Sequence, residues 1–257
     1  KLEIARKWKN EWHFRIGVHL LRGISNIDET RAQYAILSEV VLRVLWSEVI
    51  LNFSKTHGKP PGNGAAILSM GSLGGKQLNS TSDLDLIIIY DSKHNEISEG
   101  SKPLESRVYY PRLTKALGTA MTAEMKHGKL YELDMRLRPS GRKGPVATSW
   151  HAFKDYQMNE AWIWEHLALT RGRFICGKIQ LEKSFKLFRT KLFRNVDKQL
   201  AIQALSEMRL KIKETTSELN QLECKRGAGR IQDIELLSQL CTLINGEEVQ
   251  GVISGLA

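Results

Sequence analysis

The sequence predicts an α/β (α+β) fold in which a small mixed sheet with flanking helices is followed by a helical bundle. Three short runs have the apolar composition of strands and are bounded by turn-forming residues: residues 65–71, 83–90 and 129–138. Apolar residues recur at helical spacing before these runs, over residues 1–53, and again from residue 150 onward. Strand patterns enclosed by helical patterns are typical of a mixed α/β unit.

Taken in order, the chain divides into three expected segments. Residues 1–55 form an N-terminal helical segment, residues 56–149 form the domain that holds the sheet, and residues 150–257 form a helical bundle domain. Glycines and prolines mark residues 56–64 as the loop that leads into the sheet. We expect helices at residues 74–78, 104–124, 150–157, 159–176, 182–220 with breaks, and 231–244. These helices should cover one face of the sheet and leave the other face open to a ligand.

Composition excludes several classes of protein. With 42% hydrophobic and 26% charged residues in 257, the chain can bury an ordinary globular core. Cys176, Cys224 and Cys241 are far apart, which argues against a zinc site or a disulfide framework and favours a reducing compartment. The sequence contains neither an apolar run of membrane-spanning length nor a leader at its start. We therefore expect a cytoplasmic protein with no membrane contact, and the initial Lys1 suggests a fragment of a longer chain.

Two carboxylates, Asp83 and Asp85, lie one residue apart at the start of the apolar run that ends at Tyr90. In a strand they share one face, where their mutual repulsion and desolvation are costly unless a cation lies between them. Mg²⁺ is bound by one or two carboxylates together with substrate phosphates, so the pair predicts a metal site for a nucleotide triphosphate. Alone, an Asp-x-Asp pattern is equally consistent with the polar face of a half-exposed strand.

Two further motifs extend this pattern. Gly71 and Ser72 follow the first apolar run, where a glycine lets the backbone approach a phosphate and expose its N–H groups. In the third run, Leu133 begins an alternation that should place Asp134, Arg136 and Arg138 together on one face. Asp134 would join the metals, while the arginines would bind phosphate oxygens. Taken by itself, this run is more typical of an exposed edge strand with alternating charge.

These residues resemble the DNA polymerase β-like nucleotidyltransferase superfamily, in which three acidic residues on a small sheet hold two metal ions. Four longer motifs narrow the resemblance to the bifunctional glutamine synthetase adenylyltransferase/adenylyl-removing enzymes: Gly71 to Leu86, Tyr131 to Gly141, Gly144 to Ser149, and Trp164 to Arg171. The resemblance covers roughly residues 65–240 and identifies residues 56–149 as the nucleotidyltransferase catalytic domain.

The resemblance implies a reaction and its partners. Members of the family carry two nucleotidyltransferase modules, of which the first removes AMP from glutamine synthetase and the second attaches it. Details such as the Tyr109–Tyr110 pair and the Pro139–Gly141 turn are more similar to the second, adenylylating module. The implied reaction transfers AMP from ATP to a tyrosine of the synthetase, with Asp83, Asp85 and Asp134 as catalytic and metal-binding residues for two Mg²⁺ ions. Glutamine and the PII signal protein are the implied regulators, acting through the full-length chain.

Three alternatives remain open at this point. The chain could be the removing, phosphorolytic module, or a catalytically idle copy that senses nucleotide or binds a partner. It could also act on nucleic acid, because its net charge of +10 would attract phosphates. Basic and acidic residues alternate along the helical segments, however, and this pattern is more typical of a solvated helical surface than of a nucleic-acid site.

Some polar residues in the helical part have no assigned role. Trp162, Glu165, His166, Leu169 and Arg173 recur at steps of three and four, so a helix over 159–176 would align them in one stripe. Glu165, His166 and Arg173 could then face the nucleotide, although a buried and satisfied His166 is the commoner arrangement. Asp233 and Glu235 should point in different directions from a helix, and we leave them out of the metal site.

Overall fold

The computed structural model describes residues 1–93, 95–215, 223–225 and 227–246. It begins with two long helices, α1 (Leu2–Leu21) and α2 (Ile27–His57), as the helical spacing predicts. A capping box starts α2: the Glu29 N–H donates to the Asn26 side chain, and the Asn26 N–H donates to the Glu29 carboxylate. The helix ends at Gly58, whose φ of +81° favours glycine, so α2 extends into the predicted loop.

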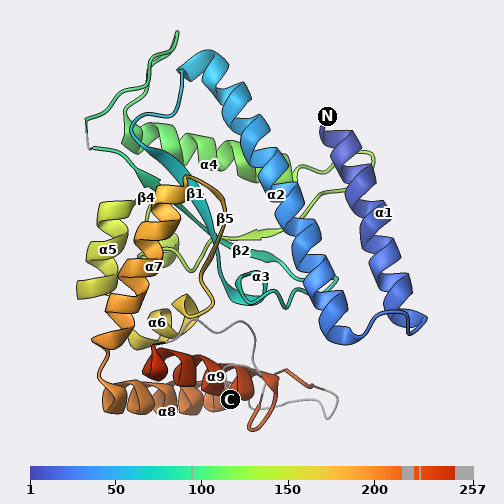
Figure 1. The fold of residues 1–257 in the computed structure, drawn as a ribbon, viewed down its shortest axis with the longest axis vertical. Helices are drawn as coiled ribbons and strands as arrows, with labels where there is room; N and C mark the ends of the chain where they lie inside the picture. Colours follow the sequence, from blue (N-terminus) through green and yellow to red (C-terminus); the bar gives the residue numbers. More distant parts are fainter. Residues whose placement is uncertain (94, 216–222, 226, 247–257) are drawn as a thin grey trace.

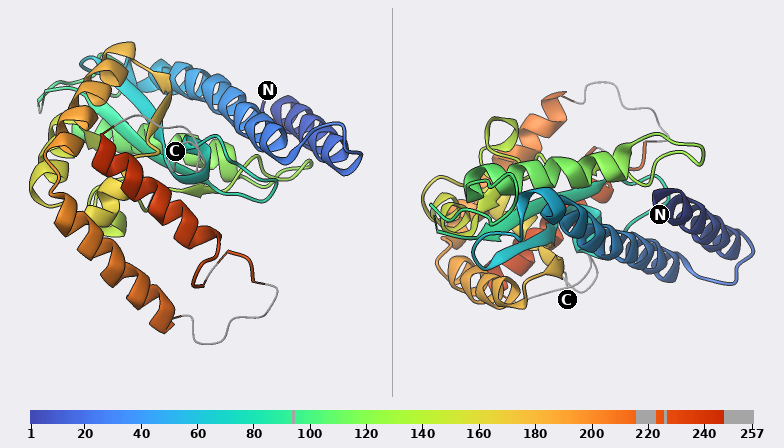
Figure 2. Two further views of the ribbon diagram at one scale, coloured as in Figure 1. Left: turned by 60° about the horizontal axis from the view of Figure 1, so that its bottom comes forward. Right: turned by 90° about the horizontal axis from the view of Figure 1, so that it is seen from above.

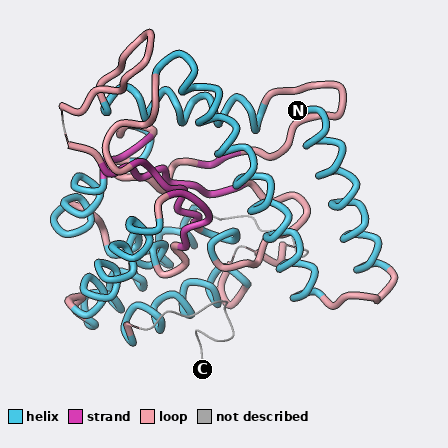
Figure 3. Tube along the Cα trace, turned by 45° about the horizontal axis from the view of Figure 1, so that its top comes forward, coloured by secondary structure: helices cyan, strands magenta, loops and turns pink. Residues whose placement is uncertain are grey.

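The sheet contains three long strands and two short ones. They are β1 (Gly64–Ser69), β2 (Leu84–Asp91), β3 (Leu133–Asp134), β4 (Ala147–Ser149) and β5 (Arg173–Gly177). The strand order is β3-β2-β1-β5, and β4 also pairs with β2. β1 runs antiparallel to β2 and β5, whereas β3 and β4 run parallel to β2. The mixed α/β class is therefore confirmed, and Figure 3 shows the strands at the centre of the molecule.

Helices cover both faces of this sheet, so the expectation of one open face is wrong. One core joins the sheet to α1, α2 and α4 (Ser106–Thr122), through residues such as Leu84, Leu86 and Ile88. The other core joins the opposite face, through Ile87 and Ile89, to the helices that follow residue 149. Alternate side chains of β2 enter different cores, and the two partly exposed residues of the strand are polar: Asp85 near its start and Asp91 at its end. Figure 1 shows β2 at the centre of the fold, among these helices.

The remaining helices are short or form the C-terminal layer. They are α3 (Gly71–Gly74), α5 (Trp150–Asn159), α6 (Ile163–Leu169), α7 (Ile179–Arg194), α8 (Lys198–Thr215) and α9 (Ile231–Asn245). In Figure 2, α8 and α9 lie side by side at one side of the sheet. The predicted stretch 182–220 is interrupted between α7 and α8, and its last five residues lie outside the described part. The short predicted helix at 74–78 is instead α3.

Two local predictions are wrong because strand pairing is decided over long range. The predicted strand 129–138 contains only the two residues of β3, after which the chain turns. Of the predicted helix 159–176, only Ile163–Leu169 form a separate helix, and residues 173–177 become β5, which pairs with β1 about a hundred residues earlier in the chain. The boundaries at residues 55 and 149 stay predictions. Across the described residues, the helices lack the combination of length and apolar character needed to cross a membrane.

Candidate active site

Parallel pairing between β2 and β3 brings two of the predicted acids together. Leu84 pairs with Leu133, and Asp85 pairs with Asp134, so the two aspartates are neighbours on the same face. Asp83 lies one residue before β2 and is exposed, whereas Asp85 and Asp134 are half-buried. The two-residue strand β3 is therefore long enough to place the third acid beside the pair.

The charges of these acids act on one another. The pKa of Asp85 is raised to about 6, chiefly by burial and then by the negative charges of Asp134 and Asp83. The positive charges of Arg136 and Lys225 act in the opposite direction without offsetting the rise. A carboxylate with a raised pKa beside like charges is a local excess of negative charge, which a bound cation would stabilise.

Arg136 holds Asp134 in this structure. Its guanidinium donates to both carboxylate oxygens, and its backbone N–H donates to Oδ1 at 2.8 Å. These hydrogen bonds lower the pKa of Asp134 below its usual value. In the described part of the chain, no three His, Cys, Asp or Glu side chains form a ready-made metal site. The oxygen donors of the three aspartates suit Mg²⁺ in their chemistry, but Asp134 is paired with an arginine instead.

Gly71 lies directly against Asp85. Its φ is +53°, a conformation that other residues adopt only with strain, and a Cβ built on it would lie 2.1 Å from Oδ2 of Asp85. The Met70 N–H also donates to the Asp85 carbonyl at 2.9 Å. The Gly71–Gly74 turn, which includes Ser72 and coincides with α3, is thus fixed next to the acids, as the sequence motif predicts.

The side chain of Arg138 binds backbone carbonyls of the protein and does not lie on the face that carries the acids. It is buried, and its guanidinium donates to four backbone carbonyls, of Met135, Arg142, Gly144 and Pro145. The prediction that it would share a face with Arg136 is wrong, because the strand ends at Asp134 and the chain turns. Arg138 instead stabilises the loop that follows β3.

The expected stripe of polar residues on residues 159–176 does not exist, because this segment is not one helix. Glu165 caps the start of α6, accepting hydrogen bonds from the Trp162 N–H and the Tyr156 hydroxyl. His166 is buried, its Nε2 lies 3.0 Å from the Gln157 carbonyl, and burial lowers its pKa. Arg173 lies on β5 and belongs to a separate network, described below.

Asp233 and Glu235 point to different partners, in agreement with their spacing on α9. Asp233 pairs with Arg209 of α8, with Nη2 and Oδ2 2.6 Å apart. Glu235 pairs with Arg171 at 3.2 Å, on the segment just before β5. Neither carboxylate joins the three acids of the sheet edge.

Sequence reasoning missed one buried carboxylate, Glu39 of α2, which pairs with Arg173. The sequence did contain a signal of this burial, because Glu39 lies between the core residues Leu37 and Val41 of an otherwise apolar stretch. An apolar groove of about 910 Å³ between α1, α2 and α4 was also unexpected. None of the three aspartates lines it.

Comparisons with known proteins find relatives that match almost the whole chain. A family model described as glutamate-ammonia ligase adenylyltransferase matches residues 1–187. A relative from Bradyrhizobium diazoefficiens is 36% identical over 254 residues, covering 98% of this chain and 26% of the relative. Relatives from Xanthobacter autotrophicus and Brucella suis are 37% and 39% identical, and the matches cover 95% and 94% of this chain and 25% of each relative.

All three relatives are named bifunctional glutamine synthetase adenylyltransferase/adenylyl-removing enzyme. The chain spans about a quarter of the length of these relatives. On this evidence, the chain belongs to the glutamate-ammonia ligase adenylyltransferase family.

Proposed function

We propose that this chain is the adenylylating nucleotidyltransferase module, which transfers AMP from ATP to a tyrosine of glutamine synthetase. The reaction would release pyrophosphate and down-regulate the synthetase. The observation that carries the proposal is the pairing of Asp85 with Asp134, with Asp83 and Gly71 alongside. Three acids beside a glycine turn are the parts that transfer from a nucleotide triphosphate requires.

Each group of residues would have its own role in the reaction, given by its chemistry. Asp83, Asp85 and Asp134 would hold two Mg²⁺ ions, which neutralise phosphate charge and lower the pKa of the incoming tyrosine hydroxyl. The N–H groups of Gly71 and Ser72 and the Ser72 hydroxyl would donate hydrogen bonds to the phosphates of ATP. Arg136 is 63% exposed in its ion pair, so it can leave Asp134 for the negative charge of pyrophosphate.

The choice between the two activities named for the relatives rests on sequence likeness. Tyr109 and Tyr110, part of that likeness, are buried and donate to the carbonyls of Gly58 and Pro61. These contacts are structural, so they favour neither the adenylylating nor the removing activity. The removing, phosphorolytic activity is therefore the principal alternative, followed by transfer of a nucleotide to nucleic acid.

We further propose the partners and compartment that the family resemblance implies. Glutamine synthetase would be the protein substrate, while glutamine and the PII signal protein would regulate the longer protein. The three free cysteines, Cys176, Cys224 and Cys241, are in keeping with work in the cytoplasm.

The test is labelling of glutamine synthetase with α-labelled ATP and Mg²⁺ by the purified chain. Asp134→Ala should lose at least about 100-fold in the rate of AMP transfer, because it removes one ligand of the reacting phosphate's cations. Asp155→Ala is the matched control, since Asp155 is an exposed carboxylate on α5. Unchanged labelling by Asp134→Ala would refute the mechanism.

The same preparation should be incubated with adenylylated synthetase and phosphate. Faster removal than attachment would assign the chain to the phosphorolytic activity. Binding of RNA or DNA with a steep dependence on salt, without labelling of the synthetase, would support the nucleic-acid alternative.

A further inference from the structure

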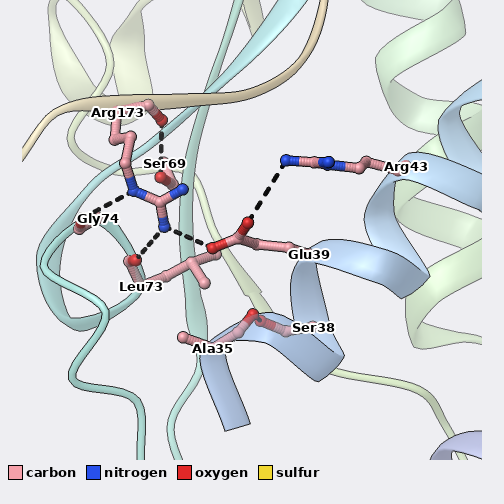
Figure 4. A network of polar contacts seen from close by, with 8 residues as sticks. All are labelled: Ala35, Ser38, Glu39, Arg43, Ser69, Leu73, Gly74 and Arg173. Atoms are coloured by element: carbon pink, nitrogen blue, oxygen red, sulfur yellow. Dashed lines mark hydrogen bonds and ion pairs between the residues drawn. The ribbon is translucent and has the colours of Figure 1, made fainter. Parts of the chain in front are cut away.

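A buried ion pair connects the Gly71–Gly74 turn to the long helix α2. Nη2 of Arg173 on β5 lies 2.6 Å from Oε1 of Glu39, and both side chains are largely buried, with 17% and 11% exposed (Figure 4). Taking two such charges out of water costs several kcal/mol per ion, and apolar residues of the same size often pack as well. Stability alone is therefore a poor explanation for this pair.

The guanidinium of Arg173 donates hydrogen bonds to the Gly71–Gly74 turn, which an apolar side chain could not do. Its Nε donates to the Gly74 carbonyl at 3.2 Å, and its Nη2 donates to the Leu73 carbonyl at 3.1 Å. Both carbonyls belong to the last two residues of the Gly71–Gly74 turn. The backbone of Arg173 is held in turn, because the Ser69 hydroxyl at the end of β1 donates to its carbonyl at 2.7 Å.

The buried side chain of Leu73 and the backbone hydrogen bonds of the turn also hold it in place, but Arg173 supplies the charged donors to its last two carbonyls. The Gly71–Gly74 segment is a single turn of helix, and no side chain caps its start at Met70. Gly71, the first residue of the turn, lies so close to the Asp85 carboxylate that even a Cβ would not fit between them. A small rotation of the turn would therefore change the distance between Gly71 and this carboxylate. A planar guanidinium with fixed donors is well suited to prevent such a rotation.

We propose that Arg173, oriented by Glu39, is a positioning residue that holds the Gly71–Gly74 turn at the distance from Asp85 that nucleotide phosphates require. The proposal rests on the proposed function, because it assumes that the turn binds the phosphates of ATP. Arg173 touches no substrate in this scheme and acts only through the carbonyls of Leu73 and Gly74.

The test compares Arg173→Lys and Glu39→Gln with a control, Arg43→Met. Arg43 pairs with the same carboxylate at 3.6 Å, but it is 57% exposed and is drawn apart from the turn in Figure 4. For Arg173→Lys and Glu39→Gln we expect a KM for ATP raised about tenfold or more, with the KM for glutamine synthetase within about twofold. Arg43→Met should change both constants by less than about twofold.

Hydrogen exchange without nucleotide supplies a second, activity-independent measurement. The amides of residues 71–75 should exchange at least about tenfold faster in Arg173→Lys than in the unaltered chain, and should be unchanged in Arg43→Met. If Arg173→Lys does not fold, Glu39→Gln decides the question alone, since it keeps the shape of the side chain.

The outcomes separate this proposal from the proposed function. A lower melting temperature with an unchanged KM for ATP and unchanged exchange would make the pair merely structural and overturn the positioning role. If the unaltered chain neither binds ATP nor labels the synthetase, the proposed function fails. The exchange experiment would still show whether the pair holds the turn.

Discussion

Replacing Gly71 with alanine adds a single carbon atom, Cβ, to the candidate site. The added Cβ would lie 2.1 Å from Oδ2 of Asp85, whereas real Cβ contacts below 3.0 Å are essentially never seen. The carboxylate or the turn must therefore move by roughly 1 Å, a displacement that costs about 100-fold in rate when it misaligns reacting groups. The φ of +53° adds about 1 to 2 kcal/mol of backbone strain for a residue with a Cβ.

The assay is again AMP transfer from labelled ATP to glutamine synthetase, combined with urea unfolding to measure stability. Gly71→Ala should lose about 100-fold in kcat/KM while its free energy of unfolding falls by about 1 to 2 kcal/mol. Gly118→Ala is the matched control: Gly118 lies within α4, and a Cβ there meets no atom within 4 Å. This control should be fully active and more stable by about 0.5 to 1 kcal/mol.

The prediction is refuted if Gly71→Ala transfers AMP at the normal rate and has an unfolding free energy close to that of the unaltered chain. It would mean that the contact between the glycine and Asp85 is not part of the active arrangement.

Three further predictions concern single side chains. Arg138→Met should lower the free energy of unfolding by about 2 to 3 kcal/mol in urea, because four carbonyls lose a charged donor, while Arg142→Met should change it by less than about 0.5 kcal/mol. Arg136→Met should lower kcat at least about tenfold with little change in the free energy of unfolding, since the Arg136 side chain is exposed. The pKa of His166 is lowered by burial, so the unfolded state takes up its proton first as the pH falls. The free energy of unfolding should therefore be greatest above the ordinary histidine pKa and should fall from pH 7.5 to 5.5, by at most about 1.4 kcal/mol per pH unit from this residue.

Each of these has a clear contrary result. A fully stable Arg138→Met would show that the loop after β3 is held by other contacts. An Arg136→Met variant with normal kcat would remove this arginine from the reaction. For His166, the variant His166→Gln should lose the corresponding part of the pH dependence, and an identical slope in both proteins would assign the dependence to another group.

Local sequence patterns were sufficient for the parts of the fold that local interactions decide. The helical spacing of α2, the alternation of β2 and the positions of Gly71, Asp83 and Asp85 all follow from residues close together in the chain. The alternation after Leu133 was misleading, because the chain turns once Asp134 is reached. The same limit explains why residues 173–177 were expected to be helical: their partner strand β1 is too far away in sequence for any local pattern to indicate.

The sequence by itself determined the fold class and the family, and it predicted the acidic residues of the candidate site. Only the tertiary structure decided that Asp134 pairs with Asp85, that Arg138 turns toward backbone carbonyls, and that Arg173 meets a carboxylate 134 positions away in the chain. Hydrophobic periodicity specifies which face of an element is buried, but it carries no information about which distant element covers that face. Strand pairing and the matching of buried charges are settled only when the whole core packs together.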